Sequence, residues 1–177
     1  MNIAVPKETA AGERRVALVP DVVKSLLRNE KLTVTVASGA GEEAGHPDSH
    51  YEEAGARIVP PEAAFEGAEV VLHVAVPSLE EIAKLKSGQV FVSHLNPWVA
   101  AETNQALAKA GASAFAMEAI PRTTRAQAMD ALSSQAAAAG YAATLIAART
   151  SGRFFGMMTT AAGTVAPAKV LVLGAGV

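Results

Sequence analysis

The stretch LTVTVASGAGEEAGH, residues 32–46, joins a short apolar segment to a glycine-rich turn. Threonine alternates with apolar residues over Leu32–Ala37, and this alternation is typical of a β-strand. The serine and glycines that follow are typical of a turn that ends a strand. A similar succession of strand, turn and helix occurs along the chain on both sides of this stretch.

Short apolar runs predict four further strands, and apolar residues at helical spacing predict four short helices between them. The expected strands are Ile3–Val5, Val70–Val74, Val90–Ser93 and Ser113–Ala116, and the expected helices are 20–28, 48–56 with Asp48 as its N-cap, 79–85 and Ala100–Ala110. Strands that alternate with helices favour an α/β fold with a parallel sheet. We therefore expect a Rossmann-like (flavodoxin-like) parallel sheet.

The last third of the sequence has a different pattern. From about Thr124 to Arg149 the chain reads as one long helix, residues 152–168 read as a connection, and KVLVLGAGV at 169–177 predicts a new buried strand. We expect an N-terminal α/β domain over residues 1–124, a linking helix and connection over 125–165, and the start of a dinucleotide-binding domain over 166–177.

The final residues, LVLGAGV at 171–177, place G-x-G directly after an apolar run. This is the opening of the fingerprint G-x-G-x-x-G, in which glycines allow a tight turn and a close approach of the backbone to a pyrophosphate. Gly174, Gly176 and Val177 are thus candidate cofactor-binding residues, and a glycine turn after an ordinary strand is the alternative. The third glycine lies beyond the sequence, so we expect a fragment that binds NAD weakly or not at all alone.

Composition excludes several functions. The 177 residues are 50% hydrophobic and 18% charged, with a net charge of −2, and they form no basic stripe of the kind that binds nucleic acid. Without cysteine the chain has no disulfides, thiolate nucleophile or cysteine metal site. The longest apolar run, Ala136–Ala148, is shorter than the roughly 18–20 residues of a spanning helix. We also expect no metal site, since His46 and His50 read as loop histidines.

The stretch PRTTRAQAMDALSSQ at 121–135 concentrates hydrogen-bonding groups at the start of the expected long helix. Taken alone it is typical of a solvated helix start, in which Thr123 or Thr124 is the cap and Asp130 pairs with Arg122 or Arg125.

Four stretches together carry a family resemblance: RVAL at 15–18, the glycine-rich 39–45, PRTTRAQAMDALSSQ and the final VLGAGV. Over its whole length the sequence resembles the alanine dehydrogenase/nicotinamide nucleotide transhydrogenase superfamily. Within it, the sequence is similar to the NAD(H)-binding domain I of the proton-translocating transhydrogenase alpha subunit, an enzyme component of the Si-specific/Re-specific type. The resemblance implies hydride transfer between NADH bound here and NADP⁺ bound by a partner.

The resemblance also implies an assembly and a site. The partners would be an NADP(H)-binding beta subunit and a membrane subunit, with a homodimer of this chain lying in the cytoplasm, peripheral on the inner face of the cell membrane. Arg122, Gln127 and Asp130 would hold the nicotinamide for hydride transfer, with Ser133 and Arg125 adding cofactor contacts. Hydride transfer needs placement rather than an acid or base, and residues 127, 130 and 133 are spaced to share one helix face.

Two alternatives stay open. An alanine dehydrogenase-like amino acid dehydrogenase would hold a keto acid with an arginine, a lysine and a histidine. Arg15 and His94 match two of these positions, but Ala75 stands where the lysine would be, which removes a charged donor. A non-catalytic binding module on the same fold is the second alternative.

Overall fold

The computed structural model describes residues 1–176, and contacts along the chain divide it into two compact units. The first unit is Met1–Pro121, and the second begins at Arg122.

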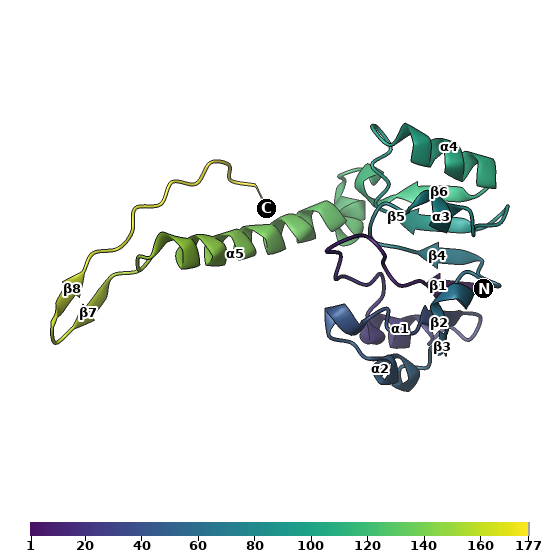
Figure 1. The fold of residues 1–177 in the computed structure, drawn as a ribbon, viewed down its shortest axis with the longest axis horizontal. Helices are drawn as coiled ribbons and strands as arrows, with labels where there is room; N and C mark the ends of the chain where they lie inside the picture. Colours follow the sequence, from purple (N-terminus) through teal and green to yellow (C-terminus); the bar gives the residue numbers. More distant parts are fainter. Residues whose placement is uncertain (177) are drawn as a thin grey trace. The chain divides into compact units, whose positions relative to one another are not determined.

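The first unit contains one parallel sheet of six strands (Figure 1). The strands are β1 Asn2–Val5, β2 Thr33–Ala37, β3 Arg57–Val59, β4 Val70–Leu72, β5 Val90–Ser93 and β6 Ser113–Ala116, in the order β3-β2-β1-β4-β5-β6. This is the strand order of a Rossmann sheet, whereas the flavodoxin order is 2-1-3-4-5. The α/β, Rossmann-like prediction is confirmed.

Every strand predicted in the N-terminal part forms, with ends that differ by no more than two residues. Beta-branched and apolar residues supply the buried faces of the central strands, so that Val5, Val36, Val71 and Phe91 are almost completely buried. The strand β3 was missed because Arg57–Val59 is only three residues long and shows no alternation.

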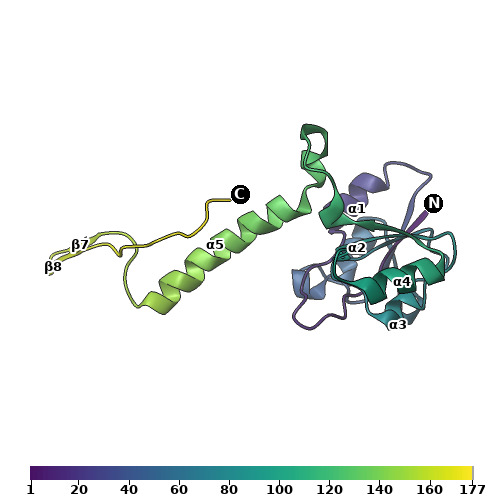
Figure 2. The same ribbon diagram turned by 90° about the horizontal axis from the view of Figure 1, so that it is seen from above.

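Four α-helices and two short 3₁₀ segments lie between the strands, and a third 3₁₀ segment follows β6. The helices are α1 Pro20–Leu26, α2 Asp48–Glu53, α3 Leu79–Ile82 and α4 Ala101–Ala110, and the 3₁₀ segments are η1 Glu42–Ala44, η2 Pro61–Ala63 and η3 Met117–Ala119. Helix α1 contacts α2, and α3 contacts α4, which Figure 2 shows side by side.

The expected N-cap role of Asp48 is wrong, because Pro47 holds that position and Asp48 is the first residue of α2. The Asp48 carboxylate instead accepts bonds from the Gly39 backbone N–H, at 2.8 Å, and from the Ser38 hydroxyl, at 2.6 Å. A carboxylate in the first turn of a helix is still favoured by the helix dipole. The two hydrogen bonds of Asp48 therefore connect the turn after β2 to the start of α2.

Tyr51 on α2 anchors the glycine-rich turn after β2. Its side chain is fully buried, and its hydroxyl donates to the Leu18 carbonyl at 2.9 Å. A Cβ at Gly41 would lie 2.6 Å from the Tyr51 ring and 2.6 Å from the His46 carbonyl oxygen. Only glycine leaves room there, so the turn and the tyrosine fit each other.

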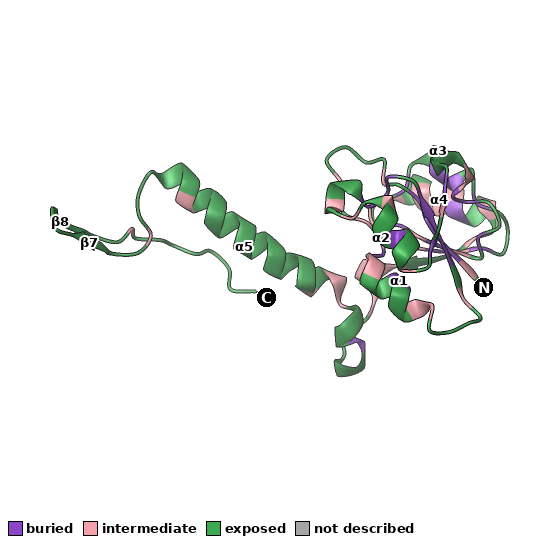
Figure 3. Ribbon diagram, turned by 90° about the horizontal axis from the view of Figure 1, so that it is seen from below, coloured by how far each residue is buried: buried purple, intermediate pink, exposed green. Residues whose placement is uncertain are grey.

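The second unit consists of a 3₁₀ helix, one long α-helix and a two-stranded antiparallel hairpin. These are η4 Thr124–Met129, α5 Ala131–Ser151, β7 Met158–Thr160 and β8 Gly163–Val165. No residue of α5 is buried, and Figure 3 shows α5 and the hairpin almost entirely exposed. The expected single helix from Thr124 to Arg149 is wrong in its first turns, because Asp130 interrupts it.

The strand expected at 169–177 is absent from the residues described, which end at Gly176. Residues 166–176 have no regular secondary structure, and Leu171, Val172 and Leu173 are exposed. A central strand of a parallel sheet takes its hydrogen bonds from neighbours on both sides. The strands described in the second unit, β7 and β8, pair with each other in a separate hairpin. Val177 lies outside the described residues.

Within residues 1–176, none of the helices combines the length and the apolar character that crossing a membrane requires.

Candidate functional site

The polar groups of PRTTRAQAMDALSSQ meet around Asp130, where η4 ends and α5 begins. Asp130 is the N-cap of α5, and its Oδ1 accepts a hydrogen bond from the Ser133 backbone N–H at 2.9 Å. Its Oδ2 accepts from the Ser133 hydroxyl at 2.6 Å and lies 3.7 Å from Arg122 Nε. The structure therefore brings Arg122, Asp130 and Ser133 together.

The bonds from Ser133 lower the pKa of Asp130, and the nearby Arg122 guanidinium lowers it further. Both effects favour the ionised carboxylate. Asp130 is thus an anion held in a fixed orientation at neutral pH, available as a hydrogen-bond acceptor.

The geometry differs from the expected helix face. Gln127 lies in η4, Asp130 has φ −76° and ψ 81° outside both helices, and Ser133 lies in the first turn of α5. The physical reason is N-capping. The side chain of an aspartate accepts a hydrogen bond from the backbone N–H three residues further on, and aspartate is therefore more favourable at the N-cap of a helix than in its interior. The predicted caps Thr123 and Thr124 are wrong for α5, since Asp130 caps it.

A hollow of about 210 Å³ opens beside Asp130, and we call it the Asp130 hollow. It is lined by Arg122, Thr123, Thr124, Ala126, Gln127 and Asp130. Drug-sized ligands occupy roughly 300–1,000 Å³, so this hollow suits a single ring with a carboxamide and not a whole dinucleotide. The lining offers a cation, an anion, hydroxyls and an amide that both donates and accepts.

Among the described residues, Arg125, Gly174 and Gly176 do not line the Asp130 hollow. Arg125 is an exposed residue of η4. Gly174 and Gly176 lie in the exposed segment near the end of the chain, where Gly174 has φ 103°, a conformation that favours glycine. The predicted residue Val177 lies outside the described part.

The residues that match a keto-acid site already have partners within the first unit. Arg15 Nη2 lies 2.6 Å from Glu13 Oε2, and this bond is the main cause that lowers the Glu13 pKa to about 2. His94 Nδ1 lies 3.6 Å from Glu118 Oε2, while Glu118 Oε1 accepts the backbone N–H groups of Leu95 and Asn96. These contacts leave Arg15 and His94 held by carboxylates of the same chain.

His46 and His50 line a separate hollow of about 520 Å³ together with residues of α1 and α2. The described residues contain no group of three histidines or carboxylates that could hold a metal ion.

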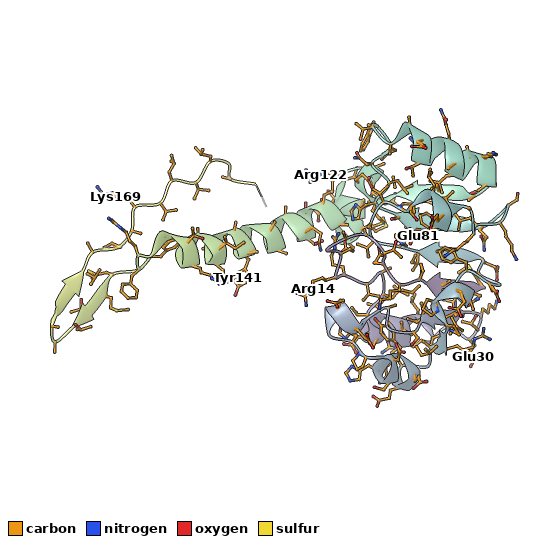
Figure 4. All side chains as sticks on the ribbon, in the orientation of Figure 1. Arg14, Glu30, Glu81, Arg122, Tyr141 and Lys169 are labelled. Atoms are coloured by element: carbon orange, nitrogen blue, oxygen red, sulfur yellow. The ribbon has the colours of Figure 1, made fainter. Side chains whose placement is uncertain are left out.

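Sequence reasoning missed a buried ionic cluster of Glu8, His73 and Glu81. His73 Nδ1 lies 3.3 Å from Glu8 Oε2, and its Nε2 lies 3.4 Å from Glu81 Oε1. The three side chains are 1–7% exposed, and Figure 4 labels Glu81. A signal was present, since Glu8 and His73 closely follow β1 and β4, and parallel neighbouring strands bring their carboxyl ends together.

Comparison with known proteins places the chain in a family. The N-terminal domain of the family described as Alanine dehydrogenase/PNT matches residues 4–139, and the C-terminal domain of that family matches residues 143–177. The NAD(P) transhydrogenase subunit alpha of Cereibacter sphaeroides is 45% identical over 180 residues, which cover 100% of this chain and 34% of that protein.

Solved structures give the same result. A transhydrogenase structure from Sinorhizobium meliloti is 43% identical and has a TM-score of 0.90, covering 95% of this chain and 50% of that one. An L-alanine dehydrogenase structure is 34% identical and has a TM-score of 0.63, covering 67% of this chain and 32% of that one. The chain thus spans at most half the length of each. The predicted resemblance is confirmed, and the chain belongs to the alanine dehydrogenase/PNT family.

Proposed function

We propose that this chain is part of the NAD(H)-binding component of a proton-translocating transhydrogenase of the Si-specific/Re-specific type. Hydride would pass between NADH held here and NADP⁺ held by a partner. The observation that carries the proposal is the Asp130 hollow, where Arg122, Gln127 and an ionised Asp130 meet. The 45% identity to a transhydrogenase alpha subunit supports it.

The residues of the Asp130 hollow fit a nicotinamide carboxamide and its ribose. The carboxamide has both a donor and an acceptor, and the Gln127 amide matches both. The Asp130 carboxylate accepts from an amide N–H or a ribose hydroxyl, while Ser133 fixes its orientation. Arg122 offers a cation to the ribose or to the second nucleotide. A bound NADH supplies the hydride chemistry, and these side chains contribute placement and charge.

Further cofactor contacts would come from Arg125 and from the segment with Gly174, Gly176 and Val177. The proposal includes an N-terminal α/β domain over residues 1–124, a linking helix and connection over 125–165, and the start of a dinucleotide-binding domain over 166–177. In the structure, Leu171–Leu173 are exposed and form no strand, so residues 1–177 by themselves should bind NADH weakly. A micromolar affinity for NADH in isothermal titration calorimetry would contradict this expectation.

The assembly would contain an NADP(H)-binding beta subunit, a membrane subunit and a homodimer of this chain, peripheral on the cytoplasmic face of the cell membrane. The exposed apolar side chains of α5 support the dimer. Tyr141, labelled in Figure 4, is 71% exposed, and Leu145, one turn further on, is 54% exposed. Residues four apart share a helix face, so this pair forms an apolar strip that a second copy could cover.

The test uses the full-length subunit combined with its NADP(H)-binding partner. Asp130→Asn and Gln127→Ala should each slow hydride transfer at least about tenfold, because a displaced ring no longer faces its acceptor. Ser134→Ala is the matched control, since the Ser134 hydroxyl bonds only the Ala131 carbonyl within α5. Unchanged transfer in both site variants would instead favour a non-catalytic binding module.

The amino acid dehydrogenase remains the second candidate, because an L-alanine dehydrogenase shares the fold. Three observations weigh against it: Ala75 occupies the lysine position, Glu13 holds Arg15, and Glu118 lies beside His94. Pyruvate- and ammonia-dependent oxidation of NADH by the full-length protein would reverse this order.

A further inference from the structure

The strand order of the first unit reverses between β1 and β4. From β1 the chain continues outward to β2 and β3, and it later returns to β4 on the other side of β1. In open α/β sheets such a reversal leaves a crevice at the carboxyl ends of the two central strands, where ligands bind. Here, that position lies between the segment after β1 and the segment after β4, and we call it the crevice.

The Glu8 carboxylate bridges the two segments that border this crevice. Its Oε1 accepts the Val74 backbone N–H at 2.7 Å, and its Oε2 accepts the Ala75 backbone N–H at 3.1 Å. Two successive backbone N–H groups that point to one anion form the arrangement by which proteins bind carboxylates and phosphates. Glu8 is the anion in that arrangement, and its side chain is only 4% exposed.

His73 completes the surroundings of the anion. Its Nδ1 lies 2.8 Å from the Ala75 carbonyl oxygen, which can only accept, so Nδ1 carries a proton. The same atom lies 3.3 Å from Glu8 Oε2, while Nε2 points to Glu81. Burial raises the pKa of Glu8, whereas His73 and the two backbone N–H groups lower it. The site therefore has two backbone N–H donors and the His73 ring arranged around one carboxylate.

Glu81 lies in α3, and its carboxylate is not the one that the Val74 and Ala75 N–H groups bind. Its carboxylate accepts the backbone N–H and the hydroxyl of Ser78 and the hydroxyl of Thr9. These bonds, made despite burial, hold the pKa of Glu81 below its usual value. Glu81 thus remains satisfied when Glu8 is changed.

We propose that the crevice between β1 and β4 is a carboxylate-binding site whose carboxylate is supplied by Glu8, and that a free monocarboxylate occupies it when that side chain is removed. Glu8→Ala deletes one methylene and one carboxylate, which are together the heavy atoms of acetate. The Val74 and Ala75 N–H groups then lose their acceptor, and buried donors without an acceptor are unfavourable. Acetate restores both bonds without any change in the backbone.

The test compares the thermal unfolding of the full-length Glu8→Ala variant in sodium acetate, sodium chloride and acetamide at matched concentration. Acetate should raise the melting temperature by about 3–5 °C at roughly ten times its dissociation constant, and chloride and the neutral acetamide should not. The amide resonances of Val74 and Ala75 should shift with the same acetate dependence.

Glu8→Gln is the control, because its amide still fills the crevice and leaves no room for acetate. An equal response to all three additives, no response to any, or the same acetate response in Glu8→Gln would overturn the proposal. A Glu8→Ala variant that stays unfolded even in acetate would also overturn it, since the added anion should replace the missing bonds.

Discussion

Replacing His73 by glutamine tests the buried cluster of Glu8, His73 and Glu81, because the change removes the imidazole and keeps most of the volume. In the structure, His73 lies 3.3 Å from Glu8 and 3.4 Å from Glu81. Two opposite unit charges at this separation attract by about 5 kcal/mol at an effective dielectric constant of 20, before desolvation is counted. Removing one partner of a buried ionic group typically destabilises a protein by about 3–5 kcal/mol. For a chain of this length, the melting temperature should fall by about 6–20 °C.

The stability of the His73→Gln variant should change with pH in one direction. Burial already raises the pKa of Glu8, and without the opposing charge of His73 that pKa rises further. A carboxyl group with a raised pKa in the folded state stabilises the fold at low pH, where it is neutral, and loses that contribution as pH rises through the folded-state value. Through Glu8, the His73→Gln variant should therefore lose stability as pH rises from about 5 to about 8.

The assay is urea unfolding of the full-length chain at both pH values, followed by circular dichroism. His50→Gln is the control, since His50 is an exposed histidine of α2. A loss below about 1 kcal/mol at pH 8, or a His73→Gln variant as stable at pH 8 as at pH 5, would contradict this account of the cluster.

Three further predictions concern other contacts. The bond from Arg15 lowers the pKa of Glu13 to about 2, below its ordinary value of 4.5, so the contribution of Glu13 to stability is present above pH 4.5 and lost as pH falls toward 2. The Glu13→Gln variant should therefore lose less stability over that pH range than the unchanged protein. An unchanged acid-unfolding profile would contradict the Arg15 bond. Gly41→Ala should destabilise by about 1–3 kcal/mol in urea unfolding because its Cβ would clash with Tyr51, and a variant as stable as wild type would contradict that fit. Ser78→Ala removes the capping box of α3 and should cost about 1 kcal/mol in the same assay, whereas no loss would mean that the box adds nothing.

The parallel sheet could be predicted because its signals are local. Each strand of four or five residues carries its own apolar run, so the predicted bounds of β1, β2, β5 and β6 nearly match the observed bounds. The break at Asp130 also had a local signal, an aspartate three residues before Ser133, but the alanine-rich sequence around it favoured an uninterrupted helix. Asp130 forms the cap because its carboxylate reaches the Ser133 N–H.

Other features depend on partners that are distant in sequence. The cluster of Glu8 and His73 joins residues 65 positions apart, and the only signal for it is that both residues follow predicted strands, whose pairing the sequence does not specify. The apolar segment Leu171–Leu173 looks like a strand, yet a strand exists only when a neighbour accepts its hydrogen bonds. The hairpin at Met158–Val165 reads as a connection in the sequence because its three threonines and its small residues form no clear apolar face.

The exposure of α5 has a consequence for the energetics of association. The helix has 21 residues, about 32 Å in length, and none of them is buried. Alanine, the best helix former, and the Asp130 cap stabilise it in place of packing. A helix that is ordered before contact has already lost its backbone freedom. A partner that binds Tyr141 and Leu145 on α5 therefore avoids the entropy cost of ordering the segment, and it binds more tightly than it would bind the same residues in a disordered segment.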